Sequence, residues 1–313
     1  MAEKLATREA YGAALTELAE KYDFVVLDAD LAEATKTVKF KKAYPERFFD
    51  CGIAEGNMMS VAAGIATTGK TVFASSFAMF AAGRAFEQVR NSIGYPHLNV
   101  KIGATHAGIT VGEDGATHQC NEDIALMRTI PGMTIVNPAD AVEARAAVEC
   151  ALSTDGPFYL RFGRFAVPVI NDNAEYKFEL GKGVILRDGK DVTIVATGLM
   201  VGLALEASEL LASEGIDARV INIHTIKPID KEILCKAAQE TGAIVTAEEH
   251  NIIGGLGSAV AEAVAEGAPV PVIRIGMQDT YGHSGTVPAL LEQYGLTPAA
   301  IAEGAKRALA LKK

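Results

Sequence analysis

Residues 133–162 read MTIVNPADAVEARAAVECALSTDGPFYLRF, and they contain a helical segment between two strand-like runs. The runs MTIVN (133–137) and FYLRF (158–162) are rich in β-branched and aromatic residues, which favour strands. The helical pattern runs from Pro138 through ADAVEARAAVECAL, with Asn137 as its expected cap and Pro138 suited to its first turn. A strand, a helix and a second strand in this order predict a βαβ unit within a parallel sheet.

The same alternation of strand-like and helical runs occurs in both halves of the chain. The other strands are expected at 23–30, 70–76, 99–105, 191–197, 217–223, 242–249 and 271–276, and a final helix is expected to open at Thr297 and Pro298. Residues 163–183 show no sustained period and contain Pro168, Gly181 and Gly183. We therefore predict an α/β fold of two domains, at 1–165 and 183–313, joined by a linker at 166–182. Each domain is expected to be a mainly parallel sheet flanked by helices.

Composition excludes several classes of protein. The chain has 313 residues, 49% of them hydrophobic, and a formal net charge of −10, with no basic run longer than residues 39–42. This charge argues against a nucleic-acid or membrane surface, although small anionic substrates need only a local basic pocket. Four widely spaced cysteines and the absence of an 18-residue apolar run predict reduced thiols, a cytoplasmic location, and neither export nor membrane anchoring.

The loop ATHAGITVGEDGATHQ (104–119) follows the strand expected at 99–105 and therefore lies at a carboxyl edge, where α/β sheets bind ligands. It collects His106, Glu113, Asp114 and His118 among three glycines. A glycine-rich turn with solvated charges is the simpler interpretation for any one of these residues, whereas the set together favours a functional site. No helical metal-binding spacing and no phosphate-binding glycine motif occur in the chain.

Glu55 stands alone among small and apolar residues in FDCGIAEGNMMSVAAGIA (49–66). Burying a carboxylate without a partner costs several kcal/mol, so Glu55 must either reach water or be paired. Phe77 and Phe80, in VFASSFAMFAAGRAFEQVR (72–90), are three residues apart, a spacing that by itself is typical of core packing.

Four stretches together resemble the thiamine-diphosphate enzymes of the transketolase family: GIAEGNMMSVAAGIA (52–66), SSFAMF (75–80), THAGITVGEDGATHQ (105–119) and EEHNIIGGLGSAVAEAVAE (248–266). The resemblance extends over essentially the whole chain and is specific to the C-terminal half of transketolase. It implies a pyrimidine-binding domain followed by a transketolase C-terminal domain. It also implies transfer of a two-carbon ketol unit between sugar phosphates, as in the pentose phosphate pathway.

The same resemblance assigns roles around the cofactor. Glu55 is expected to hydrogen-bond N1′ of the aminopyrimidine of thiamine diphosphate, which favours the imino tautomer whose nitrogen removes the C2 proton. Phe77 and Phe80 match the aromatic residues that pack against this ring, and Asp30 and Leu31 are further expected cofactor contacts.

Substrate contacts follow from the same comparison. His118, also expected to take part in catalysis, and Asp114 match the residues that hydrogen-bond the ketose donor near its C1 and C2 oxygens. His106 is expected further along the sugar, within reach of the substrate phosphate.

Two arginines are expected to bind the substrate phosphate by resemblance. Arg161 in YLRFGR and Arg8 in ATREAYG take these positions, and a planar guanidinium is well suited to a forked contact with phosphate. A surface ion pair is the alternative for both. The serine that the family carries on the phosphate rim is not evident here, where Ala34 stands near that position with Thr35 beside it.

One family motif is missing. The diphosphate is held in the family through Mg²⁺ by a G-D-G motif, and no G-D-G occurs in this sequence. The resemblance therefore implies one subunit of a split transketolase, with no metal ligands of its own, that joins an N-terminal partner in an α2β2-type assembly. The alternatives are a subunit similar to deoxyxylulose-phosphate synthase or to the 2-oxo acid dehydrogenase beta chain, and a non-catalytic assembly subunit.

Overall fold

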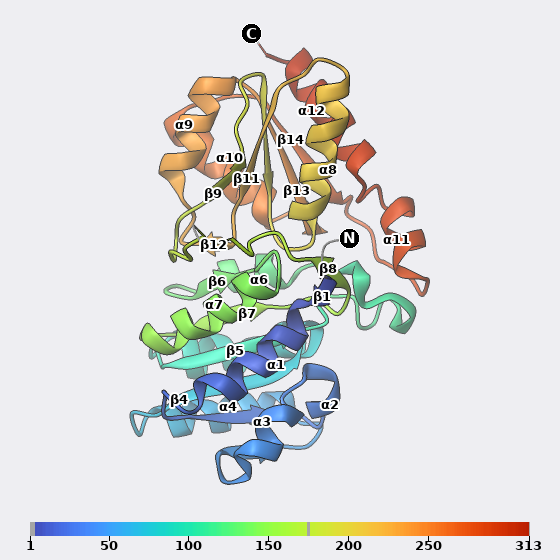
Figure 1. Cartoon of the computed structure of the whole chain (residues 1–313). Coiled ribbons are helices and arrows are strands. Elements are labelled where there is room, and N and C mark those ends of the chain that lie inside the picture. Colours follow the sequence, from blue (N-terminus) through green and yellow to red (C-terminus); the bar gives the residue numbers. More distant parts are fainter. Residues whose placement is uncertain (1–3, 174–175, 313) are drawn as a thin grey trace.

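The computed structural model describes residues 4–173 and 176–312, which form two lobes, one above the other (Figure 1). The lower lobe contains a seven-stranded sheet in the order β12-β6-β7-β5-β4-β2-β3. Its strands are β2 (Phe24–Asp28), β3 (Phe48–Asp50), β4 (Thr71–Phe77), β5 (Val100–Thr105), β6 (Thr134–Val136), β7 (Phe158–Arg161) and β12 (Thr225–Lys227). All neighbours run parallel except β12, which is antiparallel to β6.

Helices cover both faces of this sheet because the side chains of its strands alternate between two cores. Phe24 and Val26 pack with helices α1 (Thr7–Leu18) and α7 (Ala141–Ser153), whereas Val25 and Leu27 pack with α4 (Glu55–Ala66) and the segments after β4. The remaining helical elements are α2 (Ala32–Thr35), α3 (Val38–Ala43), η1 (Pro45–Arg47), η2 (Met79–Arg84), α5 (Phe86–Gln88), η3 (Val89–Gly94), η4 (Ile109–Asp114) and α6 (Asp123–Arg128).

The upper lobe contains a five-stranded sheet in the order β14-β13-β10-β11-β9. Its strands are β9 (Val184–Arg187), β10 (Val192–Ala196), β11 (Ala218–Asn222), β13 (Ile244–Asn251) and β14 (Val272–Met277), and only β9 is antiparallel to its neighbour. The helices are α8 (Met200–Ser213), α9 (Lys231–Thr241), α10 (Leu256–Gly267), α11 (Val287–Gln293) and α12 (Pro298–Ala310). Helices α9 and α10 cover one face of the sheet, and α8 and α12 cover the other.

The α/β fold with two mainly parallel sheets is confirmed, and every expected strand forms. The cap expected for the last helix is also confirmed, since the Thr297 hydroxyl accepts from the amide of Ala300. The helix expected from Pro138 begins instead at Ala141, because the Asp140 carboxylate accepts the amide of Glu143 and caps it.

Two short strands pair across the domain boundaries expected from the sequence. Strand β8 (Ala166–Pro168), within the expected linker, pairs with β1 (Lys4–Ala6). Strand β12 lies in the second half of the sequence but extends the sheet of the lower lobe. The domain boundaries at 165 and 183 remain predictions.

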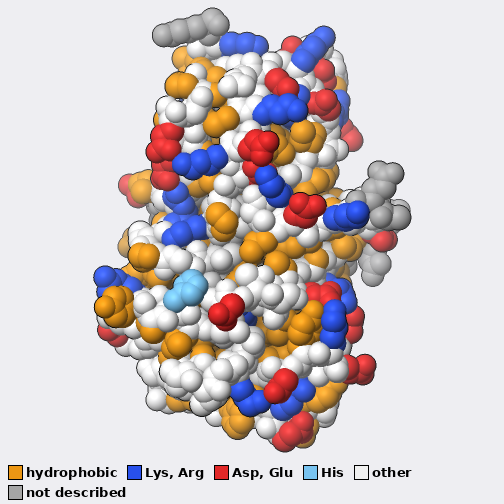
Figure 2. Space-filling view, turned by 90° about the vertical axis from the view of Figure 1, so that its left-hand side faces the viewer, with side chains coloured by type: hydrophobic (Ala, Val, Ile, Leu, Met, Phe, Trp, Pro, Cys, Tyr) orange, Lys and Arg blue, Asp and Glu red, His pale blue; other side chains and the backbone are white. Residues whose placement is uncertain are grey.

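The surface carries charges of both signs without a broad basic patch on the face shown in Figure 2. Over residues 4–173 and 176–312, no helix has both the length and the apolar composition that crossing a bilayer requires. The four cysteines are free thiols.

Candidate active site

Neighbouring parallel strands of the lower sheet end at one edge, and the segments that follow them carry most of the candidate residues. Ligands bind at this edge in open α/β sheets. The candidates are Asp30 and Leu31 after β2, Glu55 after β3, Phe77 and Phe80 at the end of β4, His106, Asp114 and His118 after β5, and Arg161 at the end of β7. Arg8 comes from the first turn of α1.

Glu55 is the first residue of α4 and is only 2% exposed. Its Oε2 atom lies 3.0 Å from Nη1 of Arg84, whose own side chain is 54% exposed. The Arg84 guanidinium also lies over the ring of Phe80, 4.4 Å from the centroid. The isolated carboxylate in the sequence is therefore buried and paired, and its partner is an arginine that sequence reasoning did not identify.

Aromatic rings line the site beside Glu55. The rings of Phe77 and Phe80 are stacked at 17° with centroids 5.8 Å apart. His106 stacks on Phe77 at 3.9 Å, and His118 approaches Phe80 edge-on at 5.3 Å. Phe77 ends strand β4 and Phe80 lies in the π-helical turn η2, so the two stacked rings come from two consecutive elements.

His106 is held as a neutral imidazole. Its Nε2 lies 2.9 Å from Nη1 of Arg8, and its Nδ1 lies 2.9 Å from the hydroxyl of Thr105. Burial, followed by the charges of Arg8 and Arg164, lowers the pKa of His106 to about 3. Because Arg8 can only donate, Nε2 accepts and the ring proton is on Nδ1.

Asp114 and His118 lie on the open part of the loop that follows β5. Asp114 ends η4 with a side chain that is 40% exposed, and the Nδ1 atom of His118 contacts the hydroxyl of Thr117 at 2.9 Å. The backbone folds back between them at Gly115, whose φ of +79° favours glycine. The loop thus brings the two predicted donor-binding residues to the same edge as the aromatic rings.

The two arginines predicted to bind phosphate, Arg8 and Arg161, lie in different surroundings in the structure. Arg8 reaches the site, where it contacts His106 and donates to the carbonyl of Ala34 at 3.0 Å. Arg161 does not: its side chain is 3% exposed, its Nε donates to Asp123 at 2.8 Å, and its Nη2 donates to the carbonyl of Glu249 at 2.9 Å. A guanidinium buried in this way between the two lobes does not fit the phosphate role predicted for Arg161.

Arg164, three residues further along, is the arginine that reaches the open site. Its side chain is 36% exposed, and its Nη1 donates to the carbonyl of Val111 at 2.6 Å and to Asp114 at 3.4 Å. Its charge also acts on His106. The stretch RFGR contains both arginines, and the sequence offered no signal to choose between them.

We expect Arg161→Ala to lower the free energy of unfolding by about 3 to 5 kcal/mol, because it leaves the carboxylate of Asp123 buried without its cation. Arg164→Ala, which removes a surface contact, should change it by less than about 0.5 kcal/mol. Urea unfolding of the two variants and the wild-type chain measures both values. Equal destabilisation by the two substitutions would contradict the structural role given to Arg161.

A buried carboxylate shapes the loop that carries Asp30 and Leu31. Asp28 is fully buried, accepts the amide of Leu31 at 2.7 Å, and accepts the hydroxyls of Thr35 and Thr37 at 2.7 and 2.8 Å. Burial raises the pKa of Asp28 to about 6. Thr35 therefore points into the protein and does not replace the missing serine, whereas Asp30 is exposed at a positive φ of 62°.

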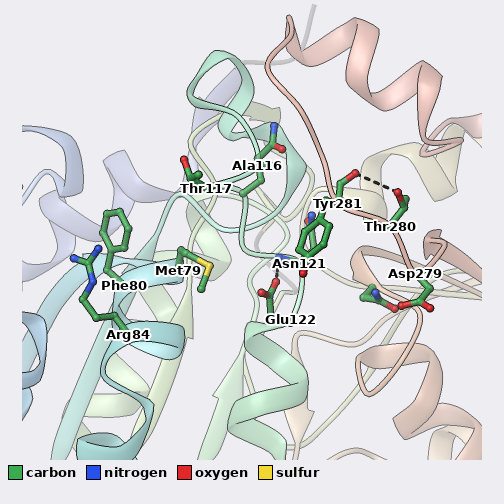
Figure 3. Close-up of a pocket in the computed structure, with 12 residues that line it drawn as sticks. Met79, Phe80, Arg84, Ala116, Thr117, Asn121, Glu122, Asp279, Thr280 and Tyr281 are labelled. Carbon is green, nitrogen blue, oxygen red and sulfur yellow. Dashed lines mark hydrogen bonds between the residues drawn. The ribbon is translucent and has the colours of Figure 1, made fainter.

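A cavity of about 760 Å³ opens beside these residues (Figure 3). Phe80 and Arg84 form one wall, and Thr280 and Tyr281 from the upper lobe form the opposite wall. Thr117 lies on the loop between them. The cavity extends the site from the aromatic rings toward the C-terminal half of the chain.

The residues present fit an aminopyrimidine ring better than a metal ion. A buried carboxylate such as Glu55 can share a proton with a weakly basic ring nitrogen, and stacked phenylalanines offer a flat apolar surface. Among the described residues, no group of three or more His, Cys, Asp and Glu side chains is arranged to hold a metal ion.

Comparisons with known proteins identify both parts of the chain. Residues 3–169 match the family described as "Transketolase, pyrimidine binding domain", and residues 181–301 match "Transketolase, C-terminal domain". A protein of Methanocaldococcus jannaschii, assigned by its name to a transketolase C-terminal section, is 52% identical over 299 residues, covering 95% of this chain and 94% of its own.

A second relative is the "6-deoxy-6-sulfo-D-fructose transketolase subunit SqwH" of Clostridium sp. (strain MSTE9), which is 47% identical over 95% of this chain and 92% of its own. Among solved structures, "Split gene transketolase, inactive beta4 tetramer" superposes with a TM-score of 0.91 and 54% identity, covering 99% of this chain and all of that one. The chain therefore belongs to the transketolase family, whose pyrimidine-binding and C-terminal domains it contains in that order.

Proposed function

We propose that this chain is the C-terminal subunit of a thiamine-diphosphate-dependent transketolase that transfers a two-carbon ketol unit between sugar phosphates. The observation that carries the proposal is the buried carboxylate of Glu55 beside the stacked rings of Phe77 and Phe80, with His106 and His118 against the same rings. The test is ketol transfer from a ketose phosphate to an aldose phosphate by this chain together with its partner.

Each group has a distinct role in this proposal. Thiamine diphosphate, when bound, supplies the nucleophilic carbon that accepts the two-carbon unit. Glu55 holds a proton at N1′ of the aminopyrimidine, and Phe77 and Phe80 pack against that ring. Asp30 and Leu31 contribute further cofactor contacts.

The diphosphate and its Mg²⁺ are proposed to be held by a separate N-terminal subunit, because this sequence contains no G-D-G motif. The solved structure named as an inactive β4 tetramer of a split-gene transketolase supports this division. Its chain matches this one over its whole length, and its name describes a tetramer without activity. We therefore propose an α2β2-type assembly as the active form. The cytoplasmic location remains a prediction from cysteine usage.

The substrate is proposed to lie along the loop after β5. Asp114 and His118 bind the donor near its C1 and C2 oxygens, and Arg8 with His106 lies further out. Arg164 replaces Arg161 as the second phosphate-binding arginine, on the basis of its exposure and its place beside Asp114. Sugar phosphates of the pentose phosphate pathway are the proposed substrates, whereas the relative named for sulfofructose makes a sugar sulfonate the alternative anion.

The rival enzyme classes fit less well. His106 stands where deoxyxylulose-phosphate synthase usually has an aspartate, and the loop GEDGATHQ does not resemble that of the 2-oxo acid dehydrogenase beta chain. A non-catalytic assembly subunit would have no need of Glu55, Asp114 and His118 together.

Arg164→Ala is expected to lower kcat/KM for phosphorylated sugars by about ten- to a hundredfold in the assembled enzyme, since a hydrogen bond to a charged group contributes about 1.5 to 3 kcal/mol. The same variant should lose little activity with hydroxypyruvate and an unphosphorylated acceptor, which serves as the control. Similar losses with both substrate classes would remove the phosphate role from Arg164.

A further inference from the structure

Residues 106–119 form a loop that we call the substrate loop. Residues of the C-terminal half of the chain contact this loop and hydrogen-bond to it. Glu249, on β13 and 4% exposed, accepts the backbone amide of Thr110 at 2.7 Å through its Oε1 atom. Thr110 lies in η4, midway between His106 and Asp114. In Figure 1 this loop lies below α11, so the upper lobe covers it.

Two glycines of the loop, Gly108 and Gly115, allow the upper lobe to approach it closely. A Cβ atom added to Gly108 would overlap the carboxylate of Glu249, and one added to Gly115 would come within 2.5 Å of the hydroxyl of Ser284. Both glycines also have a positive φ, of 80° and 79°. Side chains at these two positions would push the loop away from the upper lobe.

A second hydrogen bond to the C-terminal half is made by Gln119, the last residue of the loop. Gln119 Nε2 donates to the carbonyl of His283 at 2.9 Å, and it also approaches the carbonyls of Ile109 and Gly112 at 3.3 and 3.2 Å. One buried amide thus joins η4 to the segment that precedes α11. The loop is fixed at its middle by Glu249 and at its end by Gln119.

Glu249 is itself held in place from the lower lobe. Its backbone carbonyl accepts from Arg161, which is paired with the buried carboxylate of Asp123. Its neighbour Glu248 points elsewhere, where it accepts the amides of Leu256 and Gly257 at the start of α10. Of these two adjacent buried carboxylates, only Glu249 reaches the substrate loop.

We propose that Glu249 is a positioning residue, through which the C-terminal domain sets the conformation of the substrate loop. Held at Thr110, the loop keeps His106 against Phe77 and presents Asp114 and His118 at the open site. The effect of Glu249 on turnover rests on the function proposed above, but its effect on the loop does not. Glu249 makes no contact with the reacting atoms in this proposal.

The first test uses the full chain alone and measures amide hydrogen exchange across residues 106–119. Glu249→Ala should speed exchange in this loop by about ten- to a hundredfold, as expected for losing a hydrogen bond to a charged acceptor. Glu249→Gln keeps an acceptor oxygen at the same reach and should restore most of the protection. Glu248→Gln, which alters the adjacent buried carboxylate, should leave the loop unchanged. If Glu249→Ala does not fold, Glu249→Asp withdraws the carboxylate by one methylene and should give the same local effect.

The second test uses the assembled enzyme. Glu249→Ala should lower kcat/KM for the ketose donor while leaving the exchange rate of the cofactor's C2 proton unchanged, because the loop and Glu55 lie on different elements. Unchanged loop protection in Glu249→Ala, or equal loss of protection in Glu249→Ala and Glu248→Gln, would overturn the proposal. Absence of ketol transfer by the wild-type assembly would instead reject the proposed function and leave the exchange result standing.

Discussion

Glu55→Gln is expected to slow exchange of the cofactor's C2 proton, and with it turnover, by about 10²- to 10⁴-fold in the assembled enzyme, the usual contribution of a general acid-base group. The carboxylate is 2% exposed, so a proton that it shared with N1′ would be shielded from water. Glutamine has almost the same shape but cannot exchange a proton with the ring nitrogen. The rate of C2 deuterium exchange, followed by NMR, measures this step without any sugar present.

The control for this experiment is Glu87→Gln, which neutralises an exposed carboxylate on the neighbouring α5 and should leave the exchange rate unchanged. Because Glu55 acts on the cofactor, the KM values for the sugars should change much less than kcat. A Glu55→Gln enzyme that exchanges the C2 proton at the wild-type rate would reject the role given to Glu55.

The second large effect is expected from the chain on its own. Purified without a partner, it should show no ketol transfer and should bind thiamine diphosphate with Mg²⁺ only weakly. The reason is that the sequence lacks the G-D-G motif, so the diphosphate has no metal-mediated contacts. Losing even two charge-assisted contacts costs about 3 to 6 kcal/mol, or roughly 10²- to 10⁴-fold in affinity.

Calorimetric titration of the isolated chain with cofactor, with and without Mg²⁺, measures this loss. Thiamine, which lacks the diphosphate, is the matched ligand, and it should bind the isolated chain about as weakly as the cofactor does. Tight, Mg²⁺-dependent binding by the isolated chain would show that it carries its own diphosphate site.

The sequence predicted nine strands of the two sheets, but not β3, β9 and β12, nor the start of one helix. Strand-forming runs such as 133–137 are local signals, and they predicted β6 within a residue at each end. Helix α7 begins later than expected because Asp140 caps it and also accepts the amides of Ile170 and Asn171. Asn137, the expected cap, donates its backbone N–H to the carbonyl of His224. That bond joins residues far apart in the sequence, which local propensity cannot reveal.

The candidate site shows the same limit. The lone carboxylate of Glu55 predicted that a partner or water must exist, but Arg84 is 29 residues away and reaches it from a π-helical turn that ordinary helical spacing does not describe. Arg161 and Arg164 differ only in what surrounds them. Arg161 is buried and bonded to Asp123 and to the backbone of Glu249. Neither contact can be inferred from the stretch RFGR.

We propose that this chain completes its active site against a separate subunit that supplies the diphosphate domain. The test is to titrate a fixed amount of this chain with a G-D-G-containing partner purified from the same host. Ketol transfer is measured in the presence of thiamine diphosphate and Mg²⁺. Neither chain alone should be active, and activity should rise linearly and stop rising at one partner per chain. Ketol transfer by this chain alone, at a rate that the partner does not increase, would show that its active site is complete without a separate subunit.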